Sequence, residues 1–188
     1  MKNHEKILKR MKKSAISYLA RYEVSEFQFK NTMIRKLSNF ENELSEQHKI
    51  EIVEKIKKEM TASGYINDKR FAEMKSRSIR RQGGSSRLIF AKLKEKGVAD
   101  NIIQYSLDKV DEGNENAEII AAVKFMKKKN MGAFHKNKDS DIDIYLLKQK
   151  WFGVLSRRGF SLSIINKVLN IPDIENADSI MEDNICLL

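Results

Sequence analysis

The sequence has little cysteine, proline or glycine: one Cys, one Pro and eight Gly among 188 residues. The single cysteine, Cys186, excludes an internal disulfide, and His4, His48 and His135 lie too far from it and from one another to match a zinc-binding spacing. Long apolar runs are also missing, because the longest span about five residues, such as IIAAV at 119–123. The sequence therefore predicts no metal site, no membrane span and no secretory signal.

Scarce proline and glycine, together with many Lys, Glu, Leu, Ile and Ala residues, are typical of helices joined by short turns. No segment alternates between apolar and polar residues over a useful length, as a half-buried strand does. With 41% hydrophobic residues the chain can build a core, and its length suits one domain or a row of small modules. The expected fold class is all-α, in a reduced, cytoplasmic protein.

Positive charge exceeds negative charge by ten, with 36 Lys and Arg against 26 Asp and Glu. The excess is uneven: from Asp173 onward there are five acids and no base, so residues 1–172 carry +15. The densest basic stretch is 69–96, which holds ten bases and two acids. Such a run often only keeps a helix face solvated, but arginine also binds phosphates and carboxylates bidentately. We therefore expect a surface for a polyanion or an acidic protein.

Apolar side chains recur at helical spacing along the chain. Ser25 followed by Gln28 indicates a capping box at the start of a second helix. In the fourth helix, Phe71, Met74 and Ile79 are expected to face inward. Glycines at the helix ends mark the stops. The first helix is expected at 4–22, and an apolar stripe over 50–60, closed by Gly64, indicates the third helix. Later helices are expected at 67–82, 85–97 and 102–113.

Two stretches repeat with a register of 62 residues, KLKEKGVADNIIQYSL at 92–107 and VLSRRGFSLSIINKVL at 154–169. Gly97 falls on Gly159, each directly after basic residues at a helix end, where a left-handed cap favours glycine. A weaker copy at 32–56 lacks this glycine. With one more helix before each pair, the chain forms three units of three helices, which would stack into an elongated body.

Three segments of the sequence resemble the RecX regulatory proteins of bacteria: AISYLARYEVSEFQFKNTMIRKL (15–37), GYINDKRFAEMKSRSIRRQGGSSRLIFAKLKEKGV (64–98) and LSRRGFSLSIINKVL (155–169). They are similar to the family's opening helix pair, its central segment and its terminal Arg-Arg-Gly-Phe motif. The resemblance covers about residues 6–170. It implies a crescent of three tandem repeats at 4–62, 63–112 and 113–172, followed by an acidic tail at 173–188.

The same resemblance implies a monomeric regulator that binds the RecA recombinase filament, with single-stranded DNA in its groove. It would modulate, and is expected to inhibit, the ATPase, strand-exchange and coprotease activities of RecA in DNA repair, recombination and the SOS response. No cofactor, metal or membrane is implied. Two departures from the family pattern are the polar, glycine-free turn at 38–47, from which we expect no positive contact surface, and a polar insert at 127–143.

The filament- and DNA-binding residues are expected among the bases that flank the helix turns. Basic residues before Gly97 and Gly159 would form a row along one edge of the repeats. Arg157 and Arg158 could instead only stabilise a helix C-terminus, by about 0.3–1 kcal/mol. The full set is Arg77, Arg80, Arg81, Arg87, Lys92, Lys94, Lys96, Arg157 and Arg158.

Other function classes match the sequence less well. It has no Gly-x-x-x-x-Gly-Lys-Ser/Thr loop and no recognisable nucleophile motif, so we expect no enzyme. A stand-alone DNA-binding protein of helix-turn-helix type could use GFSLSIINKVLNI at 159–171 as its recognition helix, but Lys167 is the only base there. A helical scaffold for an unrelated acidic protein is a third alternative. Trp151 is expected to pack in a core rather than stack on a base.

Overall fold

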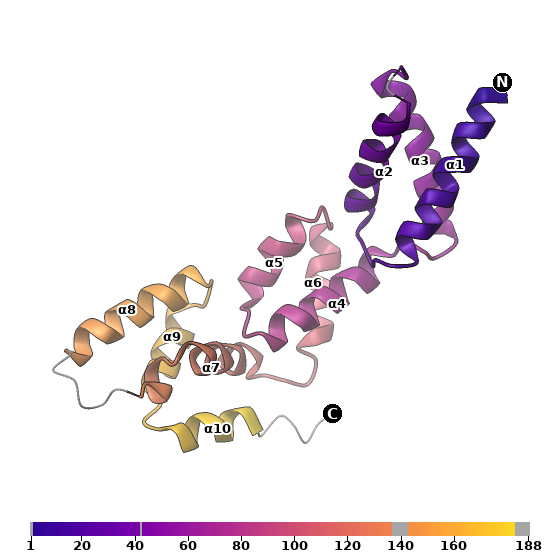
Figure 1. The fold of residues 1–188 in the computed structure, drawn as a ribbon. Coiled ribbons are helices and arrows are strands. Elements are labelled where there is room, and N and C mark those ends of the chain that lie inside the picture. The colour runs from indigo at the N-terminus through magenta and orange to yellow at the C-terminus, as the bar shows by residue number, and fades with distance from the viewer. Residues whose placement is uncertain (1, 42, 137–142, 183–188) are drawn as a thin grey trace. The chain divides into compact units, whose positions relative to one another are not determined.

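The computed structural model describes residues 2–41, 43–136 and 143–182, and all the secondary structure in these residues is helical (Figure 1). This confirms the predicted all-α class. The helices, in chain order, are α1 (Lys2–Leu19), α2 (Glu26–Phe40), α3 (Glu46–Ala62), α4 (Asp68–Arg81), α5 (Ser86–Lys94), α6 (Asp100–Val110), α7 (Ala117–Lys129), the short 3-10 helix η1 (Gly132–Phe134), α8 (Ile144–Arg157), α9 (Leu162–Leu169) and α10 (Ile174–Glu182).

The helices form two compact units. The first unit comprises Met1–Ala72 with Leu93–Ile103, and the second comprises Glu73–Lys92 with Gln104–Leu188. Their borders fall inside α4, α5 and α6, so these units divide the chain differently from the three expected repeats. The repeat boundaries and the elongated crescent stay predictions.

The core of the first unit lies between α1, α2 and α3, which pack against one another. Met33 and Ile56 of the predicted apolar stripes have no exposed surface, and neither has Phe29. Ile16 and Phe27, which belong to the same stripes, are 47% and 49% exposed, so their expected place in the core is wrong.

The carboxylate of Asp68, at the start of α4, accepts a hydrogen bond of 2.8 Å from the backbone N–H of Glu26. Burial raises the pKa of this carboxyl, partly offset by that hydrogen bond. The beginnings of α2 and α4 are therefore held together.

The core of the second unit lies between α7, α8, α9 and α10. Trp151 is 8% exposed and belongs to this core, which confirms its predicted packing role. The acidic segment after residue 172 begins with α10, which packs on α7 and η1 and buries Ala177 completely. Asp178 of α10 pairs with Lys127 of α7 at 2.8 Å. Residues 183–188 of the expected tail, and 137–142 of the polar insert, lie outside the described residues.

One expected core residue of α4 faces outward. Met74 is 42% exposed, so the prediction that it faces inward is wrong. Phe71 of this helix is buried as predicted, and so is Ser76, whose hydroxyl shares a hydrogen bond of 3.0 Å with that of Ser106 on α6. A pair of small hydroxyl side chains lets two helices approach closely, and each satisfies the other's polar group. An apolar pattern could not reveal this, because both residues are polar.

The N-terminal cap of α2 also makes a long-range contact. Ser25 Oγ accepts the N–H of Gln28 at 3.1 Å, as the capping box predicted, and donates to the carbonyl oxygen of Lys96 at 2.6 Å. Gly97 follows, with φ +73°. A Cβ there would lie 2.4 Å from Cβ of Phe27. The turn after α5 therefore lies directly against the first turn of α2.

The same arrangement recurs at the start of α5. Ser85 Oγ accepts the N–H of Leu88 at 3.1 Å and donates to the carbonyl oxygen of Arg158 at 2.7 Å. Gly159 follows with φ +94°, and a Cβ there would lie 2.7 Å from Ser85 Oγ and 3.1 Å from Cβ of Arg87. We call each arrangement a serine joint: a serine that caps one helix also donates its hydroxyl to the carbonyl just before a left-handed glycine at the end of another helix. Gly97 and Gly159, the two glycines related by the 62-residue repeat, each belong to a serine joint. This shared contact explains why the repeat places a glycine at both positions.

Removing the hydroxyl of Ser85 is expected to cost more stability than removing that of an ordinary cap. Ser85→Ala loses a cap, worth about 0.5–2 kcal/mol, and also leaves the carbonyl of Arg158 without this donor, which adds about 1 kcal/mol or more. Ser161 caps α9 through the N–H of Ile164 and is exposed, so Ser161→Ala is the matched control. Denaturant unfolding measures both losses. Equal losses would contradict a role for the hydroxyl beyond capping.

Candidate functional site

Seven of the nine expected binding residues belong to the second unit. Lys94 and Lys96 belong to the first unit, where Lys94 pairs with Asp100 and the carbonyl of Lys96 accepts the Ser25 hydroxyl. Arg77 is exposed on α4 and Lys92 is exposed on α5. The other five residues of the second unit divide into an internal clamp and two basic hollows.

Arg80 forms the internal clamp. Its guanidinium pairs with the carboxylates of Asp111 and Glu118, and it donates to the carbonyl oxygen of Gly84 at 2.9 Å and to the hydroxyl of Ser86 at 2.7 Å. The side chain is only 11% exposed. It therefore ties the ends of α4 and α6 to the starts of α5 and α7. With its donors occupied inside the second unit, Arg80 is not available to an external phosphate.

The first basic hollow lies between α5 and the end of α8 and has a volume of about 300 Å³. Arg87, Arg157 and Arg158 line it, so the structure brings three expected residues together. Arg87 and Arg157 are exposed, whereas Arg158 is partly buried, with its guanidinium 4.9 Å from the centre of the Phe125 ring. Arg158 thus belongs to the wall of the hollow, and the other two arginines are its accessible cations.

The second basic hollow, of about 400 Å³, lies where the end of α4 meets α7 and α10. Arg81 lines it together with Lys124, Lys127 and Lys128, three lysines outside the predicted set. Their spacing of three and four residues on one helix is the signal that could have found them. Lys127 is already paired with Asp178, so Arg81, Lys124 and Lys128 are the cations left to an external anion.

The chemistry of both hollows is that of an anion-binding surface. Among the described residues, no carboxylate lines either hollow. Arginine forks and lysine ammonium groups in such settings bind phosphate or carboxylate groups. The described part of the chain contains no cluster of three or more metal-ligating side chains. It also contains no helix long and apolar enough to cross a membrane.

Comparison with known proteins shows which proteins this chain resembles. Residues 67–107 match the model of the RecX family's second three-helix domain. The chain is 27% identical over 164 residues to the regulatory protein RecX of Myxococcus xanthus, covering 85% of this chain and 84% of that protein. It is 31% identical over 118 residues to the regulatory protein RecX of Agrobacterium fabrum, covering 63% and 58%. Over most of its length, the chain is thus similar to proteins of the RecX family.

Solved RecX structures share the fold. The crystal structure of RecX from Lactobacillus salivarius matches with a TM-score of 0.65 at 20% identity, over 88% of this chain and 96% of that one. A second crystal structure of the regulatory protein RecX matches with a TM-score of 0.67 at 19% identity, over 88% and 73%. The RecX domain match at 67–107 covers α4, α5 and most of α6 and contains seven of the nine expected binding residues.

Proposed function

We propose that the protein binds the RecA filament on single-stranded DNA and inhibits its ATPase, strand-exchange and coprotease activities. The observation that carries this proposal is the overlap of the RecX domain match with the basic segment in which the exposed Arg81 and Arg87 each line one of the two basic hollows. Two relatives are named regulatory proteins, and a regulator needs binding rather than catalysis. Single-stranded DNA within a filament offers phosphates to such a surface, and protein carboxylates offer the same chemistry.

The proposed mechanism is preferential binding to one state of the filament. A ligand shifts an equilibrium only by the difference in its affinity for the two states. A protein that contacts DNA phosphates through one hollow and recombinase carboxylates through the other would favour the filament state in which both lie within reach. It would thereby oppose the cycle of ATP hydrolysis that converts one state into the other.

The RecA ATPase on single-stranded DNA tests the proposal. We expect the rate to fall at far less than one copy of this protein per RecA, because a filament-bound regulator affects neighbouring protomers. Inhibition only after the DNA is saturated would mean that the protein coats DNA. Tight, sequence-dependent binding to duplex DNA without RecA would instead favour the helix-turn-helix alternative.

Charge-reversal variants distinguish binding through the two basic hollows from a general effect of the protein's net charge. Arg81→Glu with Lys128→Glu, and Arg87→Glu with Arg157→Glu, are each expected to weaken filament binding at least tenfold, because each pair removes two cations from one hollow. Each lost phosphate contact should also lower the salt slope of binding by about 0.7. Lys9→Glu with Lys13→Glu, two exposed positions on α1, changes the net charge equally and is the control. An equal loss in this control would mean that only net charge matters.

A further inference from the structure

Another surface of the second unit is apolar rather than basic. It begins with three consecutive residues at the start of α8: Ile144 is 63% exposed, Tyr145 is 66% exposed and Leu146 is 60% exposed. Neighbouring residues of a helix face different directions, so these three side chains are not one patch. Ile144 lines one hollow beside α8 and Tyr145 lines a second, whereas Leu146 lines neither. Exposed apolar side chains that continue into hollows mark an interaction surface.

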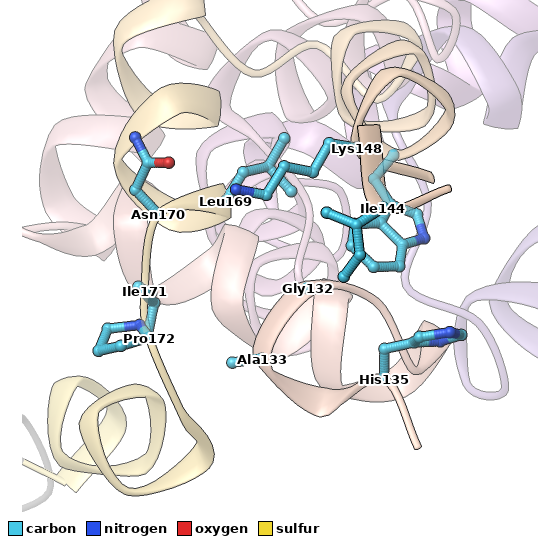
Figure 2. Close-up of a pocket in the computed structure, with 10 residues that line it drawn as sticks. Gly132, Ala133, His135, Ile144, Lys148, Leu169, Asn170, Ile171 and Pro172 are labelled. Atoms are coloured by element: carbon cyan, nitrogen blue, oxygen red, sulfur yellow. The ribbon is translucent and has the colours of Figure 1, made fainter. Parts of the chain in front are cut away.

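The two hollows share a wall. The first, of about 280 Å³, lies between α8, η1 and the connection from α9 to α10, and Ile144, Trp151 and Pro172 are among its lining residues (Figure 2). The second, of about 310 Å³, lies between α8 and α9 and includes Tyr145 and Phe152. Each exceeds the roughly 150 Å³ of a protein cavity that holds benzene, so each has room for a large apolar side chain. The shared wall consists of Lys148, Leu169 and Asn170.

The charge of the shared wall indicates what kind of molecule fits. The Lys148 side chain runs from α8 toward Leu169, across the first hollow (Figure 2). No carboxylate among the described residues lines either hollow, and Lys148 has no ion-pair partner among them. The amide of Asn170 adds a hydrogen-bond donor and acceptor beside this cation. A ligand that places apolar groups in the hollows therefore gains most when it also carries a carboxylate at the wall.

We propose that these two hollows bind a short segment of a partner protein in which large aliphatic or aromatic side chains stand next to an acidic residue. The apolar side chains enter the hollows, and the carboxylate pairs with Lys148. A nucleobase fits less well, because Trp151 is 8% exposed and offers little ring surface for stacking. This inference goes beyond the proposed function, because these two hollows share no lining residue with the two basic hollows.

Trp151 makes a direct test possible, because it is the only tryptophan in the chain and it lines the first hollow. The probes are Trp-free acetylated octapeptides that combine Leu and Phe with Asp and Glu, and the same peptides with Lys in place of the acids. We expect a saturable change in tryptophan fluorescence with the acidic set and at least tenfold weaker binding of the Lys set. Absence of a saturable change at millimolar peptide, or equal binding of both sets, would overturn the proposal.

Two variants on α8 locate the binding. Lys148→Glu is expected to lower the affinity for the acidic peptides at least tenfold. Lys150→Glu is the matched control, because Lys150 is exposed on the same helix and lines neither hollow. Equal losses in both variants would overturn the assigned site. A fluorescence change produced by an oligothymidylate, and not by the peptides, would assign the hollows to nucleic acid and also overturn it.

Discussion

Replacing Gly97 with alanine is expected to lower the free energy of unfolding by about 3 kcal/mol or more. The residue has φ +73°, a left-handed conformation that costs an L-residue roughly 1–2 kcal/mol. A Cβ would also lie 2.4 Å from Cβ and 2.5 Å from Cγ of Phe27. The Cβ of Phe27 is fixed by the backbone of α2, so no rotamer change relieves the overlap. Forcing extra volume into such a contact adds about 1–3 kcal/mol.

The matched control for Gly97 is Gly64 in the same unit. Gly64 has φ +72°, but a Cβ there meets nothing within 4 Å. Gly64→Ala therefore loses only the conformational part, about 1–2 kcal/mol. Urea unfolding followed by circular dichroism measures both variants. If Gly64→Ala lowers the free energy of unfolding as much as Gly97→Ala does, the close approach of α2 contributes nothing. Glycine would then be needed at residue 97 only because of its positive φ.

Local signals made much of the fold predictable. Helix-period stripes, cap residues and glycine stops depend on neighbours within a few residues, and Ser25 with Gln28 specified the start of α2 correctly. The second contact of Ser25 was not predictable from such signals, because its partner carbonyl belongs to Lys96, 71 residues later. The 62-residue repeat showed that a glycine recurs, but only the serine joint shows what the glycine contacts.

The candidate site was less predictable, because charge counting treats every base in a segment alike. Arg80 and Arg81 are adjacent in the sequence, yet Arg80 is paired with two carboxylates whereas Arg81 lines the second basic hollow. The partners of Arg80, Asp111 and Glu118, lie 31 and 38 residues away, so no local pattern could mark it as occupied. Conversely, the spacing of Lys124 and Lys128 places them on one face of α7, but only the structure shows that this face lies beside Arg81.

Arg80→Ala is expected to destabilise the protein by about 2–4 kcal/mol. Truncation leaves the carboxylates of Asp111 and Glu118 without their cation and removes the donors to Gly84 and Ser86. Breaking a buried ion pair typically costs about 3–5 kcal/mol, and the partial exposure of these carboxylates reduces that figure. Arg80→Lys should recover little, because one ammonium group cannot reproduce the planar fork that reaches four partners. Denaturant unfolding of both variants measures these losses.

Arg81→Ala is the control, and comparing it with Arg80→Ala separates stability from binding. Arg81 is exposed at the rim of the second basic hollow, so its truncation should change stability by no more than about 0.5 kcal/mol. It should nevertheless weaken filament binding, whereas Arg80→Ala, assayed well below its lowered unfolding midpoint, should bind almost normally. The reverse result, with Arg80→Ala stable but defective in binding, would mean that the clamp opens in the complex and that Arg80 reaches the partner after all.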